Sequence, residues 1–348
     1  MKRNLLAIAI PALLVAGAAN ASIEVWNKDG NKLSINGRVY ALNYLGNHNN
    51  GVDGEGDKTT ARIGFTGETQ VTDSLSGYGR AEWETKTGGN SFKETRYAFA
   101  GLNFGQYGSF DYGRNDGVLK AITAYTDVLP EFGGNASDNG LYVLSARTNA
   151  VATYRNNGFY GLVDGLDFAV QYGDNKSDSS TKGDSKEAYG LNAQYAILDT
   201  GVSVGGGYAT TTKAGDKERV KTYMAGVKYD AHNLYLGALY SHSKYDNEKV
   251  KGFELVAQYG IDFEVGRLTP SLAYVQHKTD EKKKDQIAKY VEVGVQYDFN
   301  KNLTAIVDYK INLLDDDKLS SKVFSTNTDG TAKGATKDTL ALGLIYQF

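Results

Sequence analysis

Strict alternation of apolar and polar residues recurs along almost the whole chain, and no other feature limits the possible folds as strongly. Near the C-terminus, Leu, Leu, Leu, Tyr and Phe stand at positions 340, 342, 344, 346 and 348, with Ala, Gly, Ile and Gln between them. Positions 253–263 and 291–299 show the same pattern. A period of two places successive side chains on opposite faces of a β-strand. The sequence therefore predicts strands with one apolar face and one polar or small face.

About sixteen such stretches can be counted, and no helical pattern of comparable strength competes with them. They begin near residues 33, 58, 76, 93, 107, 150, 165, 187, 201, 220, 233, 251, 264, 287, 301 and 337. After residue 21 no apolar run approaches eighteen residues, so no membrane-spanning helix is expected. An even number of antiparallel strands lets both chain ends meet on one side of a closed sheet. One all-β domain is predicted.

The direction of the apolar face separates a soluble barrel from a membrane barrel. Arg80, Glu82 and Glu84 alternate with small or aromatic residues on one strand, and burying such charges without water costs several kcal/mol for each unpaired group. A wet lumen removes this cost, because the apolar face then turns to lipid. Aromatic residues also gather near strand ends, as an interfacial girdle requires: Tyr229, Tyr240, Tyr259, Phe263, Tyr274, Tyr297, Phe299, Tyr309, Tyr346 and Phe348. The prediction is a 16-stranded antiparallel transmembrane β-barrel.

Residues 1–21 are expected to be a cleaved signal peptide. Lys2 and Arg3 precede a short apolar stretch, and Ala19 and Ala21 supply small residues at the cleavage site. The mature chain, residues 22–348, keeps 36 basic and 41 acidic side chains, a net charge of −5. This balance argues against nucleic-acid binding. The absence of cysteine excludes disulfides and Cys-ligated metal sites, and the four dispersed histidines give no zinc spacing, so no metal or cofactor is expected.

The links between strands are predicted to be short on one side of the barrel and long on the other. Tight links include 72–75, 104–107 and 198–200. The long polar links are 47–57, 174–186, 211–219, 245–250, 279–286 and 314–336. Such asymmetry is typical of outer-membrane barrels.

One further link, about residues 115–149, carries apolar residues such as Ile122, Leu129 and Phe132. A long loop with this content is expected to pack rather than to lie in solvent. Because sixteen strands enclose an aqueous lumen, the loop could fold inward and narrow it.

Several motifs resemble the general diffusion porins of Gram-negative outer membranes, of the OmpF, OmpC and PhoE type. They are DYGRN at 111–115, YTDVLPEFGG at 125–134, VATYRN at 151–156 and the terminal YQF. The resemblance covers essentially the whole mature chain. It implies a homotrimeric outer-membrane barrel whose third loop forms a constriction, and it implies passive, size-limited diffusion of small hydrophilic solutes and ions without enzymatic activity. Outer-membrane lipids and lipopolysaccharide are the implied surroundings.

The same resemblance implies a constriction with acids on the loop and bases on the wall. The loop acids are Asp127 and Glu131, and Asp116 and Lys120 stand at further loop positions. The basic wall comprises Arg38, Arg62, Arg96 and Arg147.

Residue parity independently supports three of the wall bases. Arg38 points inward if Val39 faces outward, Arg62 if Ile63 does, and Arg96 if Tyr97 and Phe99 do. Opposed rows of charge bias ion flux by roughly 0.4 kcal/mol per charge at about 10 Å in water, while leaving exit fast.

Five departures from the family pattern bear on selectivity and assembly. Lys120 and Asp116 replace neutral or aromatic residues, Ala121 replaces an acid, and Glu94 replaces a base two positions before Arg96. The loop between Trp83 and Arg96 is short, which leaves open whether it latches a neighbouring subunit. With a mature charge of −5, a weak cation preference is expected.

Two other functions remain as alternatives. A substrate-specific channel is expected to carry an aromatic track in its lumen, whereas this sequence places most aromatic residues outward. An outer-membrane hydrolase is supported only by Ser241-His242-Ser243, near a strand end, and no P-loop, GxSxG or HExxH motif is present.

Overall fold

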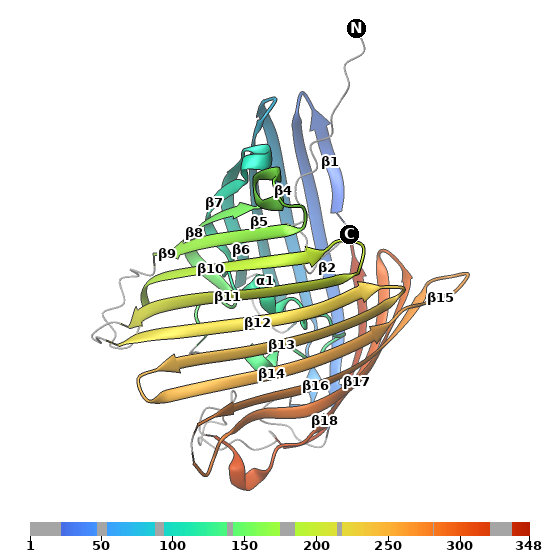
Figure 1. Cartoon of the computed structure of the whole chain (residues 1–348). Coiled ribbons are helices and arrows are strands. Elements are labelled where there is room, and N and C mark those ends of the chain that lie inside the picture. Colours follow the sequence, from blue (N-terminus) through green and yellow to red (C-terminus); the bar gives the residue numbers. More distant parts are fainter. Residues whose placement is uncertain are drawn as a thin grey trace.

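The computed structural model describes residues 22–46, 54–87, 94–137, 142–174, 185–213, 218–280, 282–320 and 336–348. The expected signal peptide, residues 1–21, lies outside them. The described residues contain sixteen strands that form one antiparallel barrel (Figure 1). These strands are β2 (Asn31–Leu45), β4 (Thr60–Thr72), β5 (Leu75–Lys86), β6 (Glu94–Asn103), β7 (Ser109–Asp116), β8 (Arg147–Asn156), β9 (Leu166–Gly173), β10 (Ser185–Ile197), β11 (Val202–Lys213), β12 (Arg219–Ala231), β13 (Leu234–Tyr245), β14 (Glu248–Tyr259), β16 (Arg267–Thr279), β17 (Gln286–Asn300), β18 (Leu303–Asn312) and β19 (Thr339–Gln347).

The sheet closes because the last strand pairs with the first strand of the barrel. β19 runs antiparallel to β2, with Leu344 opposite Ala41. Gly37 and Phe348 exchange both backbone hydrogen bonds, at 2.8 and 2.9 Å. Closure leaves no unpaired strand edge in the membrane, where an open edge would be costly. Three short strands lie outside this set: β1 (Ser22–Lys28), β3 (Gly56–Asp57) and β15 (Ile261–Asp262).

The sixteen predicted strand starts all lie within three residues of the observed ones. One predicted link is wrong: residues 245–250 do not form a long loop, because β13 ends at Tyr245 and β14 begins at Glu248. Asp246 in this turn has a φ of 51°, a left-handed conformation that suits tight hairpins. Parts of the other long links lie outside the described residues.

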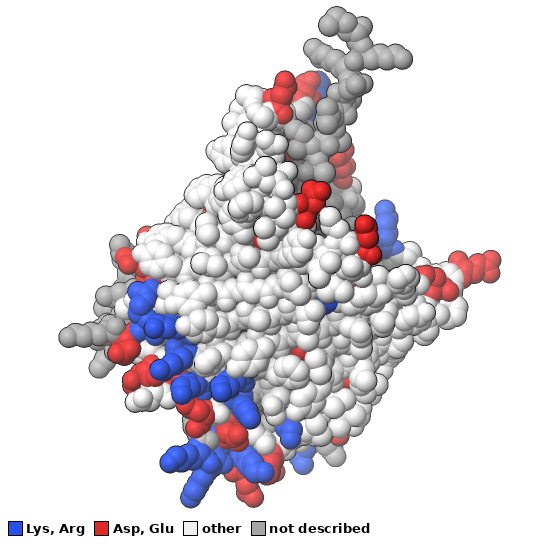
Figure 2. Space-filling view, in the orientation of Figure 1, with Lys and Arg blue, Asp and Glu red and all other residues white. Residues whose placement is uncertain are grey.

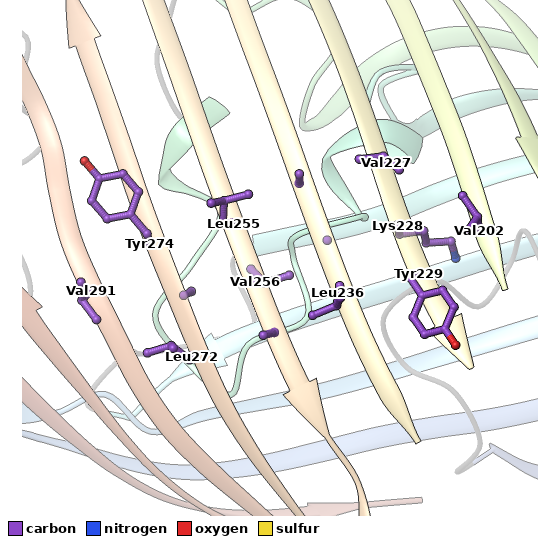
Figure 3. A pocket seen from close by; sticks show the side chains of 14 residues that line it. Val202, Val227, Lys228, Tyr229, Leu236, Leu255, Val256, Leu272, Tyr274 and Val291 are labelled. Atoms are coloured by element: carbon purple, nitrogen blue, oxygen red, sulfur yellow. The ribbon is translucent and has the colours of Figure 1, made fainter. Parts of the chain in front are cut away.

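The outer face of the barrel is apolar across the middle of the strands, where Figure 2 shows few charged residues. Leu236, Leu255 and Leu272, on β13, β14 and β16, are 42%, 43% and 54% exposed. These side chains line a shallow hollow in the outer wall, shown in Figure 3. Toward the strand ends, Tyr259 and Phe263 are also exposed. The apolar face therefore points outward, as predicted for a barrel in lipid.

Helical structure among the described residues is limited to short pieces in the links. They are α1 (Lys120–Thr123), α2 (Gly158–Gly161) and three single turns of 3₁₀-helix. None of these described helices has the length and apolar character needed to cross a membrane. α1 belongs to the link between β7 and β8, and it lies behind the front strands in Figure 1.

Candidate functional site

The link between β7 and β8, residues 117–146, is called the inward loop because its apolar side chains pack on the inner wall. Leu119 and Ile122, at α1, are fully buried, and they approach wall glycines of β11. Further along, Phe132 and Ala136 join a second buried cluster with side chains of β2, β16, β17 and β18. The loop therefore contacts two separate regions of the wall and crosses the lumen between them.

Buried wall carboxylates hold the backbone of the inward loop. The Oδ2 atom of Asp308, on β18, accepts hydrogen bonds from the amides of Glu131 and Phe132 at 2.8 and 2.9 Å. On β14, Glu254 Oε1 accepts from the Gly134 amide at 2.9 Å. A buried amide left without its acceptor costs about 1 to 3 kcal/mol, so these contacts fix the path of the loop.

Neutral wall side chains donate to the same loop. Tyr235 donates to the Tyr125 carbonyl and Gln258 to the Val128 carbonyl, each at 2.8 Å. Tyr125 itself belongs to the loop. Burial raises the pKa of its phenol to about 12, so its side chain is also neutral at physiological pH. Polar wall groups thus satisfy loop carbonyls that would otherwise be buried without partners.

Arg38 and Arg62 lie side by side on the inner wall. They are direct cross-strand partners on β2 and β4. Arg38 shares its face with Tyr40, Leu42 and Tyr44, which contact the inward loop, whereas Val39 between them is 46% exposed. The inward direction predicted from parity for these two arginines agrees with this arrangement.

Arg96 also faces the lumen, but the parity argument for it was wrong. Tyr97 and Phe99 were expected to face outward, and both are only 8% exposed. The register of β5 and β6 shifts between Glu82 and Trp83, so that Tyr97 pairs with the lumen-facing Glu82. Arg96 is the extra residue of a β-bulge. Such a bulge lets two consecutive side chains reach the same face.

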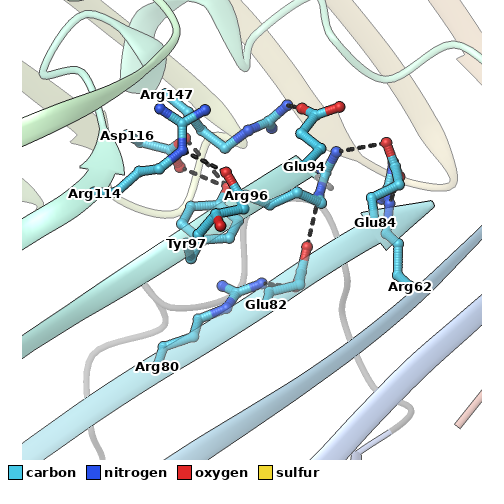
Figure 4. A network of polar contacts seen from close by, with 11 residues as sticks. Arg62, Arg80, Glu82, Glu84, Glu94, Arg96, Tyr97, Arg114, Asp116 and Arg147 are labelled. Carbon is cyan, nitrogen blue, oxygen red and sulfur yellow. Dashed lines mark hydrogen bonds and ion pairs between the residues drawn. The ribbon is translucent and has the colours of Figure 1, made fainter. Parts of the chain in front are cut away.

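Arg62, Arg80 and Arg96 are paired with wall glutamates (Figure 4). Glu84 forms ion pairs with Arg62 and, at 3.4 Å, with Arg96. Glu82 bridges Arg96 and Arg80, with both distances at 2.6 Å. The order Arg62, Glu84, Arg96, Glu82, Arg80 is a continuous chain of alternating charge, which we call the wall ladder.

Arg147 and Asp116 lie at strand ends beside the wall ladder. Arg147 begins β8, 4.0 Å from a carboxylate oxygen of Glu94. Asp116 ends β7 and accepts hydrogen bonds from the Tyr97 hydroxyl at 3.2 Å. Asp116 thus belongs to a strand, and the loop spans 117–146 rather than the expected 115–149.

The charged side chains of the loop contact partners other than the wall arginines. Lys120 and Asp127 form an ion pair with each other. Glu131 accepts hydrogen bonds from Tyr40 and Tyr44 of β2 at 2.7 and 2.5 Å. Within the described part of the chain, no ion pair joins Asp127 or Glu131 to a wall arginine. The structure thus brings the predicted residues to one lumen, but pairs most of them locally.

Five residues of this site were not among the predicted constriction residues: Arg80, Glu82, Glu84, Tyr40 and Tyr44. A signal for all of them is present in the sequence. The alternation already places the three charged residues on the lumen face, and both tyrosines have the same parity as Arg38. Their pairing with particular partners depends on strand register, which parity alone does not supply.

A closed barrel with an apolar outer face, an ionised inner wall and a loop seated inside defines a water-filled pore of the outer-membrane type. Comparison with known proteins agrees. Residues 28–348 match the family described as Gram-negative porin. The chain therefore belongs to the Gram-negative porin family.

Individual relatives support the same assignment. Outer membrane protein F of Serratia marcescens is 42% identical and outer membrane porin C of Enterobacter cloacae is 45% identical, each over the full length of both chains. Among solved structures, Salmonella typhi OmpF in complex with daunomycin matches with a TM-score of 0.76 and 33% identity, covering 94% of this chain and all of that one. The protein is thus an outer-membrane pore for passive diffusion and not an enzyme. Trimers are typical of the family.

Proposed function

We propose that this porin is a size-limited pore with a weak cation preference, and that its constriction is formed by the inward loop and the wall residues facing it. The bases are Arg38, Arg62, Arg80, Arg96, Arg147 and Lys120. The acids are Glu82, Glu84, Glu94, Asp116, Asp127 and Glu131. The charges of these twelve residues cancel, and Asp308 and Glu254, the wall carboxylates that hold the loop, are not counted among them because they are fully buried beneath it. The mature charge of −5 then favours cations slightly.

The hydrogen-bonded Glu131 carboxylate carries this proposal. It is a loop charge for which the described residues provide phenol donors and no cation partner. A permeating cation therefore meets a fixed negative charge held by β2, the strand that also carries Arg38.

Reversal potentials of the purified protein in a salt gradient test the cation preference. Glu131→Gln is expected to lower cation preference and Arg96→Ala to raise it. Asp262→Asn, which removes an exposed acid of β15, is the control for charge alone. Anion preference of the unmodified pore, or shifts of the same sign in both constriction variants, would contradict the proposal.

We further propose a homotrimer, as is typical of the family. Planar-bilayer recording tests this directly, since a trimer inserts three pores together. Conductance that appears in steps of three supports the proposal, and single independent steps from a monomer contradict it. The link between β5 and β6, whose short length leaves open whether it latches a neighbouring subunit, lies mostly outside the described residues.

Lipopolysaccharide is the proposed lipid partner at the end of the barrel opposite the chain termini. Figure 2 shows Lys and Arg side chains gathered along this rim, over the ends of β12 to β14. Exposed Lys221 and Lys244 are direct cross-strand partners, as are Lys251 and Lys278. The exposed ring of Tyr240 marks the adjoining apolar belt. Lysines directly above an apolar belt suit an amphiphile with phosphate groups and acyl chains.

Co-purification of the folded protein with added lipopolysaccharide tests this surface. Lys221→Glu combined with Lys244→Glu and Lys251→Glu should reduce the bound amount. Lys301→Glu, at an exposed turn beyond β17, should not. Equal binding by both variants would contradict the assignment.

A substrate-specific channel remains the alternative function. Swelling of liposomes in a size series of neutral sugars separates the two. A smooth fall in rate with sugar size supports a sieve, whereas saturation by one sugar would identify a specific channel.

A further inference from the structure

The wall ladder differs from a simple basic wall because each of its carboxylates bridges two guanidinium groups. Glu84 gives one oxygen to Arg62 and the other to Arg96, and Glu82 divides its oxygens between Arg96 and Arg80 in the same way. Figure 4 shows the two glutamates between the arginines they join. Three positive charges therefore share two negative ones.

Strand register explains why Glu84 occupies the central place. Arg38 on β2 lies directly opposite Arg62 on β4, and Arg62 lies directly opposite Glu84 on β5. Two like charges as direct cross-strand partners destabilise a sheet. A carboxylate at the next position of the same row offsets this repulsion. The bulge at Arg96 then brings a third guanidinium to the free oxygen of Glu84.

The carboxylates lie deeper in the wall than the arginines. The side chains of Glu84 and Glu82 are 9% and 4% exposed, against 19% for Arg62 and 11% for Arg96. A permeating ion therefore meets guanidinium groups whose charge is offset from behind. Because paired charges act together as dipoles, their field falls off faster with distance than the field of free arginines.

We propose that Glu84 is a selectivity-determining residue of this pore, one that suppresses an anion preference which Arg38, Arg62 and Arg96 would otherwise impose. This inference rests on the proposed charged constriction. It assigns the suppression of anion preference to an acid of the wall rather than to an acid of the loop. The solutes concerned are small inorganic and organic anions.

The size of the effect follows from the distance between the wall and a passing ion. One uncompensated charge about 7 Å away in water changes the local concentration of each ion by about threefold, and by about 1.6-fold with screening at 0.1 M salt. Cations and anions change in opposite directions. Loss of Glu84 should therefore lower the ratio of cation to anion permeability by about threefold at that ionic strength.

Reversal potentials of Glu84→Gln in a 0.1 M-range salt gradient provide the test, with Asp262→Asn as the charge-matched control outside the lumen. We expect the fall of about threefold for Glu84→Gln and no change for the control. The double variant Arg62→Gln with Glu84→Gln restores the net charge of the ladder, and its permeability ratio should return toward that of the unmodified pore. A purely structural role for Glu84 would leave the double variant as altered as the single one.

Equal permeability ratios in Glu84→Gln and Asp262→Asn would overturn the inference, as would a double variant that is not restored. If Glu84→Gln does not fold, Glu82→Gln tests the same ladder, since Glu82 bridges two arginines in the same way and should shift selectivity in the same direction. Glu131→Gln separates the two levels of the proposal. If Glu131→Gln shifts selectivity and neither ladder variant does, the ladder inference fails alone; if none of them shifts it, the charged constriction fails as well.

Discussion

The contact between the inward loop and β14 can be tested by adding a single methyl group at Gly252. The carbonyl oxygen of Ala136 occupies the space that a Cβ at this position would need, and Ser241 of β13 donates a hydrogen bond to the same carbonyl. β14 is hydrogen-bonded to strands on both sides, so the loop has more freedom to move than the wall. Gly252→Ala should push residue 136 by roughly 1.5 Å toward the lumen, to reach van der Waals contact.

The expected energy is that of overpacking, about 1 to 3 kcal/mol, which the loop relieves by moving. Displacement narrows the pore, so single-channel conductance should fall and larger neutral sugars should enter liposomes more slowly. Gly206→Ala on β11 is the matched control, because a Cβ there meets its nearest neighbour, the Met224 carbonyl, at an ordinary 3.4 Å. Conductance in Gly252→Ala that equals the control, or exceeds it, would refute the idea that the loop is held against β14.

Two further predictions concern the loop anchor and the lipid face. Asp308→Ala leaves the Glu131 and Phe132 amides without their acceptor, at about 1 to 3 kcal/mol for a buried group, so excursions between conductance levels should become roughly tenfold more frequent; unchanged recordings would mean that other contacts suffice. Leu272→Lys places a charge on the exposed apolar face and should reduce folding stability in vesicles by about 2 to 4 kcal/mol, measured by denaturant titration. A loss well below 1 kcal/mol would show that this face does not meet the hydrocarbon core.

The strands could be predicted from the sequence because each strand shows the alternating pattern within its own residues. Alternation is local, and a strand such as β19 shows it without reference to its neighbours. The exception at residues 245–250 has a local cause. Polar residues there resemble a loop in composition, yet Glu248 to Val250 already pair with β13 and continue its hairpin. Composition alone does not distinguish the polar end of a strand from a loop.

The details of the site were less predictable because they depend on pairing between strands. The bulge at Arg96 reverses the faces of Tyr97 and Phe99, and nothing in the β6 sequence marks it. The partners of the loop acids were equally hidden. Tyr40 and Tyr44 reach Glu131 across about ninety residues of chain, through a path that only the folded loop defines. Residue parity identified which side chains face the lumen. The register between strands then determined which of the charged side chains form pairs.

Local pairing of charges has a consequence for how the pore selects. Each ion pair of the wall ladder presents a dipole, so a permeating ion more than a few ångströms away feels energies comparable to or below thermal energy. Sites of this strength bias entry without holding a solute, which keeps exit fast. The position of the inward loop must then carry most of the selection. That position depends on contacts such as those of Asp308 and Gly252, which are separate from the ion pairs of the wall ladder. Size exclusion is therefore set mainly by the position of the inward loop and ion preference by the fixed charges, and Glu131 belongs to both sets because Asp308 holds its amide while its carboxylate faces permeating cations.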